Sequence, residues 1–316
     1  MPLFFHSRNL FLTAALALLC TPARNQVQSP PQTPAPAPLA QASSLIQSAQ
    51  LPQAEHVLHT YLSQNPASAP SMYLLGYVLQ RENRPAESLA WFTKAAALKP
   101  PSAEDLKIVA LDYVLLGDYK QATYRLQQAL QIVPSDPDLW YDLGRAQMSD
   151  GDYVRAEQAF HHVLAVAPRS VKAENNLGLT YEAQNRSADA LHAYLTAIAW
   201  QQNDPHPSEQ PLLNYGTLLI SQNRSAEALP SLQQATQISP NNERCHEQLA
   251  RALAAIGAIT EAITELKQAV DLDPRNARLH YQLGQLYRRT NHPDLARREL
   301  GLSAQLYGSH HTPEEK

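Results

Sequence analysis

The chain has 316 residues, 17% of them charged, and a formal net charge of −4 at pH 7. Charges of both signs are mixed along it, so the sequence offers no basic stripe of the kind that binds nucleic acid. Its two cysteines are Cys20 and Cys245. If the first is removed with an export signal, a single thiol is left and an internal disulfide is excluded.

The N-terminal segment 1–23 predicts such an export signal. Arg8 gives it a basic start, and an apolar run of about ten residues follows, which is a signal core rather than a bilayer span. We expect cleavage after Ala23 and a periplasmic or secreted protein. The alternative is a membrane-anchored lipoprotein attached at Cys20, which the bulky Leu19 before it disfavours.

Residues 24–38 are rich in proline, glutamine and alanine. This composition stays extended and cannot pack a core, so it predicts a spacer between the signal and the folded part. Residues 39–68 follow with a degenerate first copy of a repeat. Ala49 stands in it where a turn residue belongs, which makes that turn doubtful.

A period of 34 residues organises the rest of the chain. Prolines recur at this step, at Pro66, Pro100, Pro134 and Pro168 and again at Pro240 and Pro274. A fixed period of this size indicates stacked supersecondary units. We expect seven of them in 69–307, followed by a disordered tail at 308–316. Their ranges are 69–102, 103–136, 137–170, 171–204, 209–242, 243–276 and 277–307.

Each unit repeats the same small and large positions. A small residue recurs at Gly76, Ala110, Gly144, Gly178, Gly216, Ala250 and Gly284, and a large one at Phe92, Leu126, Phe160, Tyr194, Leu232, Leu266 and Leu300. Between them, Asn83, Gly117, Gly151, Asn185, Asn223, Gly257 and Asn291 are residues that adopt the left-handed cap of a helix. Every unit is therefore predicted to be a helix, a tight turn and a second helix.

This pattern resembles the tetratricopeptide repeat family, and with the signal it is similar to exported bacterial members. The resemblance is fullest at Trp140, Leu143, Gly144, Ala156, Phe160 and Pro168. It implies an all-α, right-handed superhelical solenoid of antiparallel helix pairs. Trp140 is expected in the core between helices, where Trp140→Ala would cost roughly 3 to 5 kcal/mol.

The resemblance also implies that the first helix of each unit lines a concave groove, which holds an extended peptide or a protein partner. Carried onto this sequence, the candidate residues are Tyr73, Tyr77, Arg81, Lys107, Tyr141, Asp142, Arg145, Asn175, Asn176, Asn214, Gln248, Arg251, Tyr281 and Gln282. Aromatic and arginine side chains are favoured where binding energy concentrates. The carboxamides among them either bind a peptide main chain or simply face water.

One interruption breaks the period. Gly178 to Gly216 is a step of 38 residues, and the excess falls in 203–208, where Pro205 and Pro207 forbid helix. Such an insertion is either a recognition loop or a tolerated accident. The sequence alone favours the accident.

No catalytic constellation, metal-ligand set or cofactor motif is found, and the Cys245–His246 neighbours lack the shaped site of a catalytic pair. We therefore expect a non-catalytic protein–protein interaction scaffold without a cofactor, active in envelope assembly or secretion. It contacts a membrane only if it is lipid-anchored. Two alternatives stay open. One is a self-associating structural protein that forms a homo-oligomer, and the other is an accessory subunit that regulates an enzyme.

Overall fold

The computed structural model describes residues 36–309, which form sixteen α-helices and no strand. In chain order they are α1 (Ala37–Gln47), α2 (Leu51–Gln64), α3 (Ala69–Arg81), α4 (Pro85–Ala96), α5 (Ala103–Leu115), α6 (Tyr119–Ile132), α7 (Pro137–Ser149), α8 (Tyr153–Val166), α9 (Val171–Ala183), α10 (Ser187–Trp200), α11 (Gln210–Ser221), α12 (Ser225–Ile238), α13 (Glu243–Ala255), α14 (Ile259–Leu272), α15 (Ala277–Arg289) and α16 (Pro293–Ser309). The expected all-α solenoid is confirmed.

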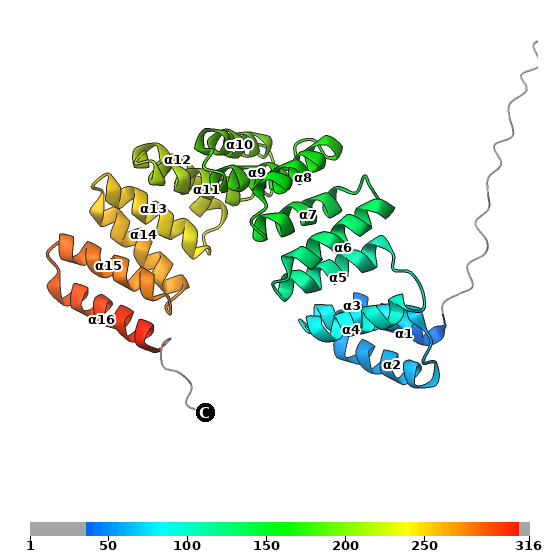
Figure 1. Ribbon diagram of the computed structural model, residues 1–316. Coiled ribbons are helices and arrows are strands. Elements are labelled where there is room, and N and C mark those ends of the chain that lie inside the picture. The colour runs from blue at the N-terminus through cyan, green and yellow to red at the C-terminus, as the bar shows by residue number, and fades with distance from the viewer. Residues whose placement is uncertain (1–35, 310–316) are drawn as a thin grey trace, which may run out of the picture.

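The helices pack as consecutive pairs that stack in chain order into an arch (Figure 1). The first helix of a pair also contacts the first helix of the next, as α7 does α9 and α9 does α11. Near the crown of the arch, α9 and α11 lie on the inner side and α10 and α12 on the outer side. The first helices therefore form the inner surface.

The ends of the helical array differ slightly from the sequence prediction. The predicted signal (1–23) lies outside the described residues, as do most of the linker and of the tail. Helix α1 begins at Ala37, two residues inside the predicted linker, with Pro38 in its first turn. Proline is tolerated there because the N–H it lacks would have no partner in the helix. At the other end α16 runs to Ser309, so the tail begins later than expected.

The small and large positions predicted from the period meet inside each pair. A Cβ atom added to Gly144 would lie 2.7 Å from the Phe160 ring, and one on Gly76 equally close to Phe92. Phe160 and Tyr194 are completely buried. The glycine thus lets the two helices of a pair approach until the large side chain fills the space between them.

The turn inside each pair has the predicted left-handed residue. Gly117, Gly151 and Gly257 have φ between +76° and +88°, and Asn83, Asn185, Asn223 and Asn291 have φ between +58° and +60°. The degenerate first pair forms the same turn with Ala49, whose φ is +57°. Its turn is therefore made despite the wrong residue type.

Ala49 gives a first testable prediction. The left-handed conformation costs an L-residue about 1 to 2 kcal/mol, a cost that glycine does not have, and Ala49 is exposed. We expect Ala49→Gly to stabilise the α1–α2 pair by about 1 kcal/mol in urea unfolding or amide exchange. The control Ala40→Gly, at an exposed site inside α1, should destabilise it. A loss of stability in both variants would contradict the strain account.

Trp140 corrects an expectation. The residue is only half-buried, because its ring stacks on His162 (centroids 4.1 Å apart) at the edge of the core. Its indole N–H donates to the carbonyl oxygen of Pro134 at 2.8 Å. Trp140 therefore joins one unit to the end of the preceding one, and its truncation should cost less than that of a fully buried aromatic.

Two histidines occupy the equivalent place in the last two pairs. Nε2 of His246 lies 3.0 Å from the carbonyl oxygen of Pro240, and Nε2 of His280 lies 3.0 Å from that of Pro274. Because a carbonyl oxygen only accepts, the ring N–H must donate, as the indole N–H of Trp140 does. The second ring nitrogen meets a carboxylate at 2.7 Å, Glu265 for His246 and Glu299 for His280.

An acidic side chain is enclosed between the second and third pairs. Asp112 is fully buried, and its Oδ2 lies 2.6 Å from the Ser88 hydroxyl, which in turn lies 2.8 Å from the carbonyl oxygen of Gly76. Its Oδ1 has no hydrogen-bond partner within the described chain. Burial raises the pKa of Asp112 to about 7, although the hydrogen bond from Ser88 opposes this.

Candidate functional site

The inner surface is held together by a ladder of side-chain contacts between successive first helices. In each contact the fifth residue of one unit meets the sixth residue of the next. The members are Lys107–Asp142 (3.7 Å), Tyr141–Asn176 (3.1 Å), Asn175–Asn214 (2.9 Å) and Glu247–Gln282 (2.8 Å). The predicted polar column was expected to face water or a peptide main chain, and it instead bonds largely to its neighbouring helices.

Between α5 and α15 the ladder has one gap, at the junction of α11 and α13; before it, at α3 and α5, the corresponding pair is Tyr73 and Ile108, and the Ile108 side chain cannot hydrogen-bond. Leu213 occupies the fifth position of its unit and cannot bond to Gln248. Gln248 is buried, and its Oε1 accepts a hydrogen bond from Arg251 at 2.6 Å. This predicted binding residue therefore positions Arg251 rather than presenting itself on the surface.

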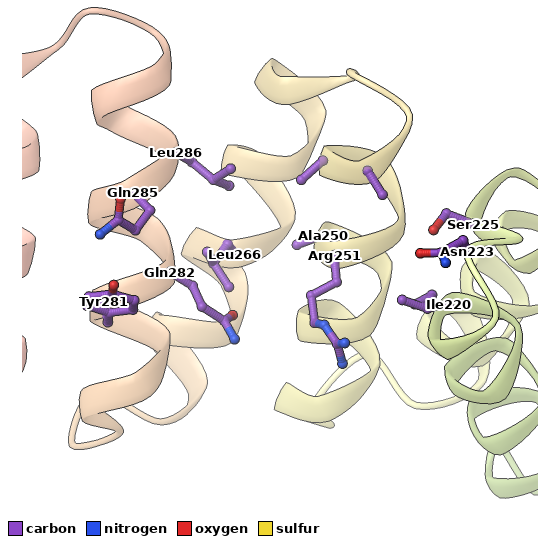
Figure 2. A pocket seen from close by; sticks show the side chains of 12 residues that line it. Ile220, Asn223, Ser225, Ala250, Arg251, Leu266, Tyr281, Gln282, Gln285 and Leu286 are labelled. Carbon is purple, nitrogen blue, oxygen red and sulfur yellow. The ribbon is translucent and has the colours of Figure 1, made fainter.

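An apolar hollow of about 440 Å³ lies on the inner surface between α11, α13 and α15. Its apolar lining is Ile220, Ala250, Ala254, Ala255, Leu266 and Leu286. Figure 2 shows Arg251 extending from α13, and Tyr281, Gln282 and Gln285 coming from the neighbouring first helix. The hollow exists because α13 ends in two alanines, whereas α15 has Arg288 and Arg289 at the matching positions.

The polar wall of the apolar hollow contains an unsatisfied acceptor. Gln282 donates through Nε2 to Glu247, while its buried Oε1 has no hydrogen-bond partner in the described chain. The Glu247 carboxylate is almost completely buried and is also held by Arg278 at 2.7 Å. Because an unpaired buried acceptor costs free energy, an N–H brought to Gln282 would recover part of it.

A second pocket, of about 480 Å³, lies between α7, α9 and the start of α11. From the helices it is lined by Tyr141, Arg145, Val171, Lys172, Asn175, Asn176, Leu179, Gln210 and Pro211, from the end of α10 by Gln201, and from the insertion by Asp204, His206 and Ser208. We call it the loop pocket. The insertion, for which the sequence favoured an accident, thus forms a wall on the inner surface.

The remaining predicted residues lie elsewhere. Tyr73 donates from its hydroxyl to the carbonyl oxygen of Lys99 at 2.6 Å and borders a small crevice beside α4 and α5. Arg81 lies 3.4 Å from the carbonyl oxygen of Ile46 at the end of α1, with its guanidinium 5.9 Å from the Tyr77 ring. Lys107 and Asp142 face each other in the ladder. These five residues connect helices and are not gathered into either pocket.

The inner surface also contains residues that the sequence analysis missed. Ile220, Ala254 and Leu286 line the apolar hollow without having been candidates. The signal for them was the pair of small residues that closes α13, Ala254 and Ala255, to which the sequence analysis assigned no role. The predicted binding residues were polar and aromatic, whereas the floor of the apolar hollow is formed by small alanine side chains.

The chain's single described thiol is not arranged for chemistry. Cys245 is fully buried, and burial raises its pKa to about 11, so the thiol stays neutral. Its neighbour His246 is turned to Glu265 and Pro240. Over residues 36–309, no cluster of three or more His, Cys, Asp or Glu could hold a metal ion. Nor, in the same range, does any helix have the length and apolarity needed to span a bilayer.

Solved structures with the same architecture are similar to this chain at low identity. A tetratricopeptide repeat protein from Parabacteroides merdae is 17% identical with a TM-score of 0.63, covering 84% of this chain and 97% of that one. Yeast Tom70 is 17% identical with a TM-score of 0.61, covering 81% and 55%. PilW, described as a type IV pilus biogenesis factor, is 21% identical with a TM-score of 0.57, covering 67% and 95%. Identities this low show the fold alone.

Curated relatives match over shorter stretches. Human protein O-mannosyl-transferase TMTC1 is 26% identical over 160 residues, which is 51% of this chain and 18% of that protein. The general transcriptional corepressor ssn6 of Schizosaccharomyces pombe is 27% identical over 113 residues, which is 35% of this chain and 10% of that protein. The chain therefore spans less than a fifth of the length of either relative.

Family profiles described as TPR repeat or tetratricopeptide repeat match most of the helical array. The matched residues are 39–103, 113–168, 141–208, 219–270 and 250–291. They include the degenerate first pair as well as the units with the full pattern. The chain belongs to the tetratricopeptide repeat family.

Proposed function

We propose that this protein is a non-catalytic scaffold that binds an extended peptide segment of a partner protein along its inner surface. The tetratricopeptide repeat is a scaffold for protein–protein interaction and is typically non-catalytic. Of the relatives named above, TMTC1 is called a transferase, so for this chain the absence of catalysis is part of the proposal. The predicted export signal supports a place in the cell envelope, in assembly or secretion.

The apolar hollow is the observation on which the proposal rests. Its floor of Ala250, Ala254 and Leu266 accepts an apolar side chain, and burying such a side chain contributes roughly 1.5 to 3 kcal/mol. Half-exposed Tyr281 and Arg251 flank it, and these residue types dominate binding energy at interfaces. The unpaired Oε1 of Gln282 suits a main-chain N–H beside that side chain.

A peptide selection with a matched pair of variants tests the proposal. Ala254→Arg fills the hollow, and the fold tolerates arginine there because α15 has Arg288 at the same position. Ala165→Arg makes the same change at an exposed site on the outer helix α8. The probe is a phage-displayed library of random dodecapeptides, selected on the immobilised wild-type chain.

We expect the wild-type chain to enrich peptides that share one apolar residue, and the Ala165→Arg control to bind them equally well. Ala254→Arg should bind the enriched peptides at least about tenfold more weakly in fluorescence polarisation, which is a loss of about 1.4 kcal/mol. Equal binding by both variants would move the site away from the hollow. Failure to enrich any peptide would contradict a peptide-binding function.

A further inference from the structure

The insertion at 203–208 is the least regular part of the array, and it is held in a defined shape. The buried side chain of Gln201 bonds to both main-chain groups of Ser208, donating to its carbonyl oxygen at 2.7 Å and accepting from its N–H at 3.0 Å. Within the loop, Asp204 accepts from the N–H of His206 at 2.8 Å. These contacts fix the wall that the insertion adds to the loop pocket.

The polar groups of the loop pocket are unevenly satisfied. Lys172 is paired with Asp138 at 2.8 Å, and its Nζ lies 4.6 Å from the centroid of the Tyr141 ring. Asn176 donates to the Tyr141 hydroxyl and to the carbonyl oxygen of Lys172. Both polar atoms of the Gln201 side chain bond to the main chain of Ser208. These side chains are therefore largely occupied in holding the pocket walls.

Two hydrogen-bond donors in the loop pocket are not occupied. Arg145 has no carboxylate within ion-pair distance among residues 36–309, and its guanidinium lies 6.0 Å from the Tyr141 ring centroid. Asn175 is 8% exposed and accepts from Asn214 through Oδ1, while its Nδ2 donates to no partner in the described chain. A guanidinium without an ion-pair partner and a nearly buried amide, lining the same pocket, offer donors to the two oxygens of a carboxylate.

The charges around the loop pocket agree with an anionic ligand. Its charged lining residues are Arg145, Lys172 and Asp204. Lys172 keeps its partner Asp138, and Asp204 is exposed at the loop edge. Asp142 on α7 attracts Arg145 at longer range and lies within ion-pair distance of Lys107. This leaves Arg145 as the lining cation with no carboxylate at ion-pair distance among residues 36–309.

From this arrangement we propose that the loop pocket binds an acidic side chain, Asp or Glu, of the peptide whose apolar side chain occupies the hollow. Arg145 pairs with the carboxylate, Asn175 donates to it, and the insertion encloses it on the α11 side. The inference rests on the proposed function and adds the chemical class of the bound peptide. It also gives the insertion a role, because the regular repeats lack this loop and therefore lack the wall that it adds to the pocket.

A double comparison isolates the carboxylate contact. Peptides enriched on the wild-type chain are resynthesised with each acidic residue changed to its amide. Each pair is then measured by fluorescence polarisation against the wild-type chain, Arg145→Gln and Arg155→Gln. Arg145→Gln keeps hydrogen-bonding capacity and removes the charge. Arg155→Gln removes one positive charge from α8, where Arg155 pairs with Asp152, and serves as the matched control.

We expect one acidic residue, at a constant spacing from the apolar one, whose amidation weakens binding to the wild-type chain and to Arg155→Gln about five- to tenfold. Against Arg145→Gln the same amidation should have almost no effect. An equal effect in all three chains, or enriched peptides without a shared acidic residue, would overturn the proposal. In those cases, weaker binding of the peptides to Ala254→Arg would still support the proposed function. A selection that yields no peptide would contradict both the proposed function and the acidic side-chain site.

Discussion

Asp112→Asn should remove about 4 kcal/mol of pH dependence from the stability of the second and third helix pairs between about pH 4 and pH 8. In the folded chain, burial raises the pKa of Asp112 to about 7 from an ordinary value of 3.8. The folded state therefore holds a proton that the unfolded state releases. The wild-type chain loses stability as the pH rises from about 4 to about 7, and above that the loss is complete.

The hydrogen bonds explain why the neutral acid fits. The hydroxyl of Ser88 lies between two oxygens, the carbonyl of Gly76 and Oδ2 of Asp112, and has one proton to donate. When Asp112 is protonated, its O–H donates to Ser88 and Ser88 donates to Gly76. When Asp112 is ionised, the single hydroxyl proton of Ser88 can serve only one of the two oxygens. In addition, the charged Oδ1 of Asp112 then has no hydrogen-bond partner within the described chain.

The measurement is urea unfolding and amide exchange of α3 to α6 at several pH values between 4 and 8.5. We expect Asp112→Asn to be the more stable chain at pH 8 and to have the flatter profile. Asp271→Asn, at an exposed site on α14, is the control and should follow the wild-type profile. Parallel profiles for Asp112→Asn and the wild-type chain would show that Asp112 is ionised in the folded state.

His280→Ala should destabilise the C-terminal pairs by about 2 to 5 kcal/mol, because it leaves two buried groups, the Glu299 carboxyl and the Pro274 carbonyl, without their hydrogen-bond partner at about 1 to 3 kcal/mol each. The exposed fractions of the His280 and Glu299 side chains are 7% and 11%. Without the imidazole, Glu299 keeps a distant contact, at 3.9 Å, with the largely exposed Arg298. The carbonyl oxygen of Pro274 loses its donor as well.

Two comparisons separate this account from a general loss of packing. His246→Ala removes the same contacts from a more exposed pair, with side-chain fractions of 12% and 27%, and should cost clearly less in the same thermal or urea unfolding. The double change His280→Trp with Glu299→Ala copies the Trp140–Ala159 arrangement of the third unit. It should restore much of the lost stability, because it returns the donor to Pro274 and leaves no buried charge. A double variant as unstable as His280→Ala would contradict the analogy.

The period and residue types were enough to predict the helices, their turns and the pairing of small with large side chains. Gly144 against Phe160 and the left-handed Asn83 follow from local rules that recur in every unit. Ala49 shows the limit of such rules, since the packing of the first pair imposes a turn that its sequence does not favour. The strain is small enough for the stacked neighbours to offset.

The histidine bonds and the pockets could not be predicted in this way. His280 and Glu299 are 19 residues apart, as are His246 and Glu265. This repeated spacing was the available signal that a histidine paired with a glutamate takes the place of Trp140 in these two units. The loop pocket depends on how Gln201 holds Ser208, a contact within a single irregular segment that no periodicity describes. The insertion and Arg145 line the same pocket because three successive units stack on one another.

The gap in the ladder at Leu213 also has a mechanical consequence. At the other junctions between α5 and α15, directional bonds such as Asn175–Asn214 and Glu247–Gln282 fix how far neighbouring first helices slide past each other. At α11 and α13 the fifth and sixth positions are bridged by non-directional apolar packing of Leu213 and its neighbours. A hydrogen bond from Asn242 to Glu209 at 3.1 Å joins only the starts of the two helices. Between α5 and α15, sliding of neighbouring first helices is therefore expected to be least restrained at this junction, which crosses the apolar hollow. Bending there would widen or narrow the apolar hollow itself, whereas the loop pocket, lined from α7, α9 and the start of α11, would keep its shape. The hollow would then admit apolar side chains of different sizes while the loop pocket holds the peptide in place.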